Sequence, residues 1–149
     1  MPTATTPDIR QLAAGKLRWS LAHLVKSFSA TPDHKLDFKP SPTANSPREL
    51  ILHVLGGNGH VAHALGMEMD PTAGPTDRDA LLQRLSETTE AIAVKLESLP
   101  DDRLDTMVDF VAGKMPMPIF LFIEDWHVAR HAGQLDYLQT MWGDMENYF

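Results

Sequence analysis

The chain contains no cysteine among its 149 residues. A protein without cysteine forms no disulfide, thiolate zinc site or iron–sulfur cluster, and it has no cysteine nucleophile. The absence of cysteine is also compatible with a reducing compartment. Because the chain has seven histidines and 20 acidic residues, imidazole and carboxylate groups are the side chains that remain for metal or acid–base chemistry.

Positive charge is scarce as well. Thirteen Lys and Arg residues face 20 Asp and Glu residues, so the formal net charge is −7, and no two Lys or Arg residues are adjacent. Nucleic-acid-binding proteins gain much of their affinity from clustered basic side chains that neutralise phosphates. We therefore expect neither nucleic acid nor an anionic membrane surface as a partner.

Long hydrophobic runs are missing too. The longest continuous apolar run is the five-residue segment Ile119–Ile123, whereas a membrane-spanning helix needs about 20 apolar residues. Residues 1–15 contain no apolar segment typical of a signal peptide. We expect a cytoplasmic protein with no membrane span. A chain of 149 residues that is 43% hydrophobic predicts one globular domain over residues 1–149.

Eleven prolines leave four long proline-free windows. Because a proline inside a helix costs about 3 kcal/mol, each window predicts one helix. The predicted helix boundaries are an N-terminus at Thr6-Pro7, a capping box at Ser46-Pro47-Arg48-Glu49, a second box at Thr76-Asp77-Arg78-Asp79, and a fourth helix from about Pro118 to Trp142 that Gly143 ends.

Four helices of about 20 residues predict an all-α fold, a four-helix bundle with long crossover connections. The long connections are Thr31–Asn45 and Pro100–Pro116, and the second contains a short extended segment at Met107–Val111. The connection Met67–Pro75 is predicted to be tighter. With two long connections, neighbouring helices need not be antiparallel pairs.

The clearest chemical motif is a pair of histidines, His127 and His131, on the fourth predicted helix. Residues four apart on a helix have Cβ atoms about 5–6 Å apart, so two imidazoles at this spacing can share one metal ion. The pair lies on the same stripe as Leu135 and Leu138, which predicts that both rings face the core. Histidines satisfied by ordinary hydrogen bonds, or partly exposed at the edge of the stripe, are the alternative.

A third candidate ligand is His53, on the apolar stripe of the second predicted helix. Three buried imidazoles without partners would be costly, and a shared divalent cation removes that cost. Three histidines plus water also form an open catalytic metal site. His60, two turns further along the same face, is the reserve third ligand, and His63 is a weaker one.

The remaining histidines receive no functional role. His23 is interpreted as a residue of an amphipathic helix, and His34 as a loop residue. Gly56, Gly57 and Gly59 follow His53 within the same helix, where each glycine costs about 1 kcal/mol relative to alanine. These glycines indicate close helix packing, a kink or room for a ligand, or simply a locally poor helix.

Glu124 precedes His127 by three residues and therefore lies on the same side of the helix. It is a candidate proton acceptor, an additional metal ligand or a hydrogen-bond partner of a ligand. A surface position for Glu124 is equally compatible with the pattern. Asp125 points further away, and a single Glu-x-x-His motif disfavours a two-iron bundle site.

Two segments resemble the DinB superfamily of metal-binding four-helix bundles, which includes bacillithiol and mycothiol S-transferases. They are Ser46–His53 and His127–Leu138, and the second is similar to the family pattern HxxxHxGQLxYL, followed here by Trp142-Gly143. The resemblance implies that His53, His127 and His131 hold one divalent metal ion, usually zinc or nickel. It further implies a cytoplasmic homodimer.

The characterised enzymes of that family use the metal to activate a low-molecular-weight thiol. The resemblance therefore predicts a mononuclear, divalent-metal-dependent enzyme, a thiol S-transferase or a related transferase or hydrolase. The position of Glu124, three residues before His127, makes it the candidate proton acceptor in such an enzyme. The alternatives are a non-catalytic stress-response protein that binds a metal or small ligand, and a purely structural bundle. Since the chain has no cysteine, a reacting thiol must arrive as substrate.

Overall fold

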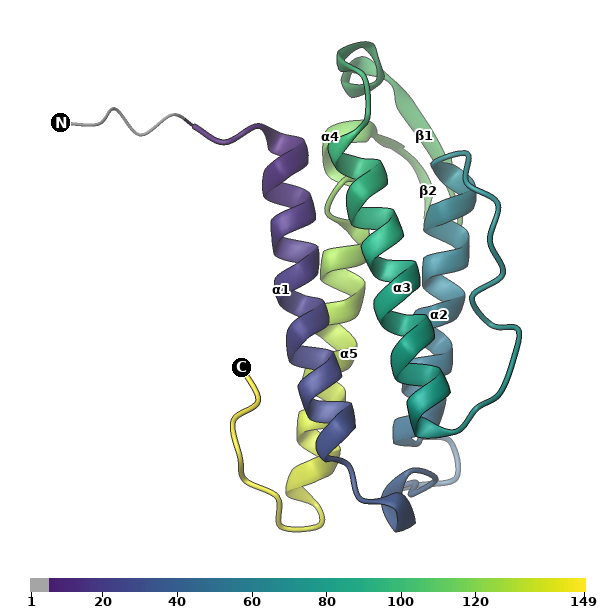
Figure 1. The fold of residues 1–149 in the computed structure, drawn as a ribbon, viewed down its shortest axis with the longest axis vertical. Helices are drawn as coiled ribbons and strands as arrows, with labels where there is room; N and C mark the ends of the chain where they lie inside the picture. The colour runs from purple at the N-terminus through teal and green to yellow at the C-terminus, as the bar shows by residue number, and fades with distance from the viewer. Residues whose placement is uncertain (1–5) are drawn as a thin grey trace, which may run out of the picture.

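The computed structural model describes residues 6–149 and is a bundle of four long helices (Figure 1). These helices are α1 (Ile9–Ala30), α2 (Pro47–Ala64), α3 (Arg78–Glu97) and α5 (Ile123–Thr140). The short elements are the 3₁₀ helices η1 (Asp33–Lys35) and η2 (Asp101–Asp105), the strands β1 (Met107–Phe110) and β2 (Gly113–Pro116), and helix α4 (Met117–Phe120). The predicted all-α bundle is confirmed. Residues 1–5, part of the predicted domain and of the segment expected to lack a signal peptide, lie outside the described residues.

The chain runs down α1, up both α2 and α3, and down α5 in the view of Figure 1. Because α2 and α3 are parallel, the segment between them returns along the length of the bundle. The connection at Met67–Pro75 is shorter than the other two connections between the long helices, as expected, but it runs along the bundle and is no tight turn. Arg84 of α3 holds this return segment in place. Its guanidinium group donates hydrogen bonds to the backbone carbonyl oxygens of Thr72, Ala73 and Pro75, which belong to the segment.

Capping side chains mark the starts of α1, α2 and α3, and the predicted capping box of α2 is confirmed. At α2 the Ser46 hydroxyl accepts from the Glu49 backbone N–H at 3.2 Å, and the Glu49 carboxylate accepts from the Ser46 N–H at 2.8 Å. The starts of α1 and α3 lie later in the chain than predicted. Asp8, not Thr6, caps α1, and Asp77, not Thr76, caps α3, because each aspartate accepts a backbone N–H of the first turn.

The fourth predicted helix is interrupted. The first turn of the predicted helix forms a separate short helix, α4, and the long helix α5 begins only at Ile123. The backbone leaves helical geometry at Phe122, where φ is −101° and ψ is 1°. The prediction of one continuous helix from Pro118 to Trp142 is therefore wrong at this point, although Gly143 has the positive φ of 87° that suits a residue just beyond a helix end. The extended segment predicted near Met107 is confirmed as β1, which pairs antiparallel with β2.

Polar side chains in contact between α1 and α5, here called the α1 seam, orient α5. Asp125 is buried and accepts from the Ser20 hydroxyl at 2.6 Å, and Asp136 accepts from the Ser27 hydroxyl at 2.7 Å. His23 Nε2 lies 2.7 Å from Asp136. The interpretation of His23 as an incidental helix residue is therefore incomplete, because the residue is buried and paired. With this side of α5 held against α1, another side faces α2.

Two sequence expectations concern exposure. His34 lies in η1 and is exposed, in agreement with its interpretation as a residue of the connection. Over residues 6–149, no helix combines the length and the apolar character that crossing a membrane requires.

Candidate metal centre

Helices α2 and α5 bring three imidazoles together, those of His53, His127 and His131. The ring centroids of His53 lie 5.1 Å from His127 and 4.6 Å from His131, and the last two are 4.7 Å apart. One potential ligand atom from each residue lies within 4.8 Å of the others. The structure thus assembles the three residues that the sequence selected, although their positions in the chain are far apart.

The three rings are not equally buried, which corrects one sequence expectation. His53 is exposed, His127 is half-buried, and only His131 is buried, at 5% exposure. The two histidines of α5 lie at the edge of its buried face, which is centred on Val128 and Ala132. A shared metal ion would therefore relieve a burial cost for His131 alone. His53 and His127 are candidate ligands because their rings converge with His131 on one point.

Each histidine of α5 has an oxygen partner for its Nδ1 atom three residues away. Glu124 Oε1 lies 3.2 Å from His127 Nδ1, and Gln134 Oε1 lies 2.6 Å from His131 Nδ1. When each Nδ1–H donates to its oxygen, the Nε2 lone pairs remain free to bind a cation. Gln134 received no role from the sequence, although its spacing of three from His131 places both on one side of the helix.

The pKa values of two imidazoles are depressed. Burial lowers the pKa of His131 to about 4. The neighbouring His127, His53 and Arg130 lower it further, and the hydrogen bond that His131 donates to Gln134 opposes this. Partial burial, His127 and Arg130 also lower the pKa of His53. Both rings are therefore neutral near pH 7, and neutral imidazole is the form that binds a metal ion.

Glu124 is buried at 2% exposure, so the alternative of a surface position is wrong. Burial raises the pKa of its carboxyl group, and the hydrogen bond with His127 opposes that rise. Asp125 faces away from the cluster, as expected, and lies against α1, where Lys16 Nζ is 3.3 Å from it.

The three glycines of α2 have separate surroundings within an unbroken helix. The ring of His127 lies against Gly57, where an added Cβ would be 2.5 Å from Nδ1 and nearer still to Cε1. A Cβ at Gly59 would be 3.3 Å from Pro71, which lies in the return segment, whereas a Cβ at Gly56 would meet nothing within 4 Å. Close packing therefore explains Gly57 and Gly59, and open space adjoins Gly56.

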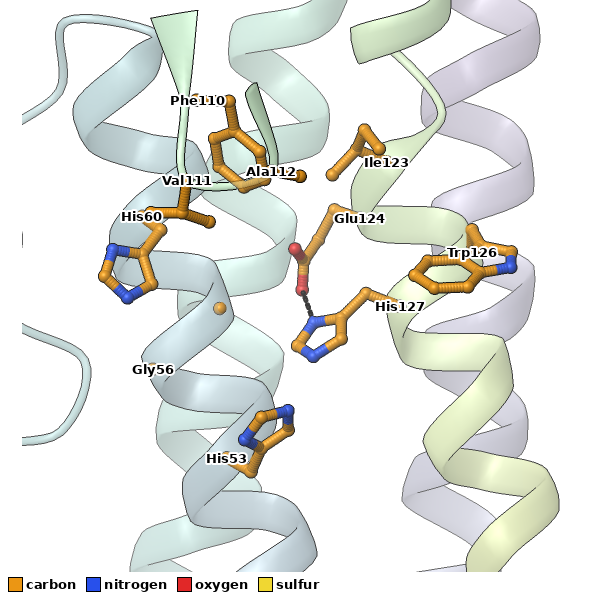
Figure 2. Close-up of a pocket in the computed structure, with 11 residues that line it drawn as sticks. His53, Gly56, His60, Phe110, Val111, Ala112, Ile123, Glu124, Trp126 and His127 are labelled. Carbon is orange, nitrogen blue, oxygen red and sulfur yellow. Dashed lines mark hydrogen bonds and ion pairs between the residues drawn. The ribbon is translucent and has the colours of Figure 1, made fainter. Parts of the chain in front are cut away.

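A pocket of about 450 Å³ adjoins the cluster (Figure 2). The β1–β2 hairpin covers one side of it, between the C-terminal half of α2 and the start of α5. Its lining residues are His53, Gly56, Gly57 and His60 from α2, Phe110, Val111 and Ala112 from the hairpin, and Ile123, Glu124, Trp126 and His127 from α5. The sequence did not associate the hairpin residues with the site.

The reserve ligands lie apart from the cluster. His60 lines the pocket, but Figure 2 shows its ring directed away from His127. His63 is exposed one turn further along α2. In the part of the chain that the structure describes, the group of possible metal ligands contains only His53, His127 and His131.

The side chains present fit a divalent transition-metal ion. Imidazole nitrogens suit zinc and nickel among other metals, and the missing Cβ at Gly57 makes the space that His127 occupies beside α2. The cluster can therefore hold one metal ion through three protein ligands.

The sequence comparison identifies the family. The DinB superfamily model matches residues 16–135, and the chain therefore belongs to the DinB superfamily. No curated protein gives a significant match.

Two solved structures have the same fold. A DinB-like protein from Bacillus cereus ATCC 10987 has a TM-score of 0.71 at 21% identity, covering 85% of this chain and 87% of its own. A DinB-like protein from Bacillus subtilis has a TM-score of 0.70 at 21% identity, covering 91% of this chain and 96% of its own.

Substitution of Gly57 by alanine is expected to weaken metal binding by about 10- to 100-fold, because the new methyl group would displace the His127 ring. Gly56→Ala is the matched control. It adds the same methyl group where nothing lies within 4 Å, so metal binding should persist and stability should rise by about 0.5–1 kcal/mol. Zinc titration against a chromophoric chelator and thermal unfolding measure both effects. Equal zinc affinity in the two variants would contradict the close-contact argument.

The depressed pKa of His131 predicts a pH-dependent stability in the metal-free protein. In the unfolded chain His131 takes up a proton as the pH falls through 6.5, whereas in the folded protein it does so only near pH 4. The contribution of neutral His131 to the free energy of unfolding is therefore fully present above pH 6.5 and is lost as the pH falls from 6.5 to 4. When the pH is lowered from 7.5 to 5.5, the free energy of unfolding should fall by about 1 kcal/mol more for the wild type than for His131→Gln. Urea unfolding after EDTA treatment measures this difference, and parallel pH profiles for the two proteins would show the prediction to be wrong.

Proposed function

We propose that this DinB superfamily protein is a mononuclear, divalent-metal-dependent enzyme. Its reaction is thiol S-transfer or a related transfer or hydrolysis on a small molecule. The observation that supports this proposal is the convergence of three imidazoles at the edge of a pocket that Glu124 also lines. Structural zinc sites are closed by four protein ligands, whereas catalytic sites keep one position for water or substrate.

Three residues are assigned to metal binding. His53, His127 and His131 would each contribute one ring nitrogen. The hydrogen bonds to Glu124 and Gln134 orient the two rings of α5, and such partners typically change metal affinity by about 10- to 100-fold when removed. When bound, a divalent cation acts as a Lewis acid and lowers the pKa of a thiol or water beside it towards neutrality.

Glu124 is the proposed proton acceptor. Its carboxyl group lines the pocket and is in hydrogen-bond contact with His127, so it lies next to the position where substrate would meet the cluster. In the transfer reaction the thiol sulfur forms a bond to an electrophilic carbon, and the bond from that carbon to its leaving group breaks with its electron pair. The thiol proton passes to Glu124.

The pocket walls would limit water around the reacting groups. Phe110, Ile123 and Trp126 give the pocket apolar sides, and a water-poor site strengthens the electrostatic interactions within it. A pocket of this kind beside the cluster favours catalysis over the alternative, a non-catalytic metal- or ligand-binding protein on the same bundle.

Metal analysis tests the three-histidine assignment. The purified wild-type protein is expected to hold about one equivalent of zinc or nickel, and His53→Ala and His131→Ala are each expected to lose at least about 99% of the affinity, because each removes one of three ligands. His60→Ala is the matched control, since His60 lies on the same helix and outside the cluster. Elemental analysis and zinc titration give the stoichiometry and affinity, and circular dichroism confirms folding. Stoichiometric metal in both ligand variants would overturn the assignment.

Substitution of Glu124 separates proton transfer from ring orientation. Glu124→Gln keeps an oxygen that can accept from His127 Nδ1–H but cannot take up a proton. We expect metal content to be unchanged and kcat to fall by about 10²- to 10⁴-fold. The assay measures chloride displacement from 1-chloro-2,4-dinitrobenzene by several low-molecular-weight thiols. Glu124→Ala should lose metal affinity as well. Full activity in Glu124→Gln would exclude Glu124 as the proton acceptor.

A further inference from the structure

We infer that the pocket covered by the β1–β2 hairpin binds an uncharged apolar group, alkyl or aryl, carried by the molecule on which the site acts. This inference rests on the proposed function for its link to catalysis, and on the pocket itself for the class of group bound.

The hairpin wall of the pocket is apolar and anchored to the core. Phe110 packs edge to face against Phe120, with ring centroids 5.4 Å apart, and Phe120 is buried. The turn residues Val111 and Ala112 continue this wall, and Val111 is 71% exposed at the pocket rim. Trp126 is 59% exposed on the opposite side. An apolar group placed between these side chains would remove their surface from water.

The hairpin side of the pocket offers no basic side chain to an anionic group. Among the described residues, neither Lys nor Arg lines the pocket, and the nearby Arg130 guanidinium lies on the α5 side, 5.4 Å from the Trp126 ring centroid. The carboxyl group of the pocket, Glu124, lies at the inner end beside His127. A phosphate or carboxylate entering from the hairpin side would therefore lose hydration without gaining a basic partner there.

The size of the pocket suits a small substituent, since pockets for small molecules span about 300–1,000 Å³ and this one is about 450 Å³. A second cavity of about 310 Å³ lies further along the α2–α5 groove, on the Gln134 side of the cluster. Thr43, Asn45, Gln134 and Tyr137 give that cavity hydroxyl and amide groups. The apolar lining thus distinguishes the hairpin side of the site.

Gly56 provides a way to fill the pocket without disturbing the helix. It lines the pocket, and an added Cβ would meet nothing within 4 Å. A leucine at this position would extend into the empty space, and it favours helix more than glycine does. Gly15→Leu is a matched control on α1, where a Cβ also meets nothing within 4 Å.

The test compares p-cresol with 4-hydroxybenzoate, which replaces the methyl group by a carboxylate. Each is titrated into the protein as purified and again after EDTA treatment, and methyl NMR signals of Val111 and Ala112 report binding. We expect p-cresol to shift both signals and to bind at least tenfold more tightly than 4-hydroxybenzoate. Gly56→Leu should weaken p-cresol at least tenfold, whereas Gly15→Leu should bind it like the wild type.

A second variant, Ala112→Asp, places a charge in the exposed hairpin turn and should also weaken p-cresol at least tenfold, whether or not Gly56→Leu folds. Methyl signals that do not respond to p-cresol, 4-hydroxybenzoate binding as tightly, or p-cresol binding unchanged in the folded variants would overturn the inference. Metal content is measured on the same samples. If the protein binds p-cresol but holds no metal as purified and takes up no added zinc or nickel, the pocket is supported and the metal-dependent function is refuted. Stoichiometric metal without p-cresol binding would do the reverse.

Discussion

The ring of His127 lies against the backbone of α2 at Gly57, and the candidate site depends on this contact. A side chain at Gly57 would occupy the space of the imidazole, so the His127 ring lies against α2 only because α2 lacks a Cβ at this position. The same contact brings His53 within 5.1 Å of His127, measured between ring centroids. A glycine that weakens the helix by about 1 kcal/mol is thus compatible with an unbroken α2, because tertiary packing supports the helix around it.

Helix α5 presents different chemistry to each neighbour. Towards α1 it buries Asp125 and contributes Asp136, both of which accept hydrogen bonds from α1 hydroxyl groups. Towards α2 it presents His127 and His131, whose Nδ1 atoms have oxygen partners on α5 itself. Because buried carboxylates need their partners, the α1 seam restricts the rotation of α5 about its axis. That restriction keeps the histidines directed at α2 and at the pocket under the hairpin.

Local sequence patterns predict the features that depend on a single helix. The capping box at Ser46 forms with both of its hydrogen bonds, and the four-residue spacing of His127 and His131 places both rings on one side of α5. The structure departs from the sequence expectations where distant segments decide the outcome. The connection after α2 runs along the bundle because α2 and α3 are parallel, and His53 is exposed although its helical stripe predicts a buried ring. Helical periodicity indicates a face but not how far a neighbouring helix covers it.

The sequence by itself determined the four main helices, the capped start of α2, and the shared side of His127 and His131 on α5, since these depend on residue type and on spacing within one helix. It also determined that cysteine takes no part, because the chain has none. Only the tertiary structure decided that Gly57 makes room for His127, that Gln134 and Glu124 orient the rings of α5, and that the hairpin forms the apolar side of a pocket beside them. These features are distances between segments far apart in the chain, and such distances follow from how the helices pack.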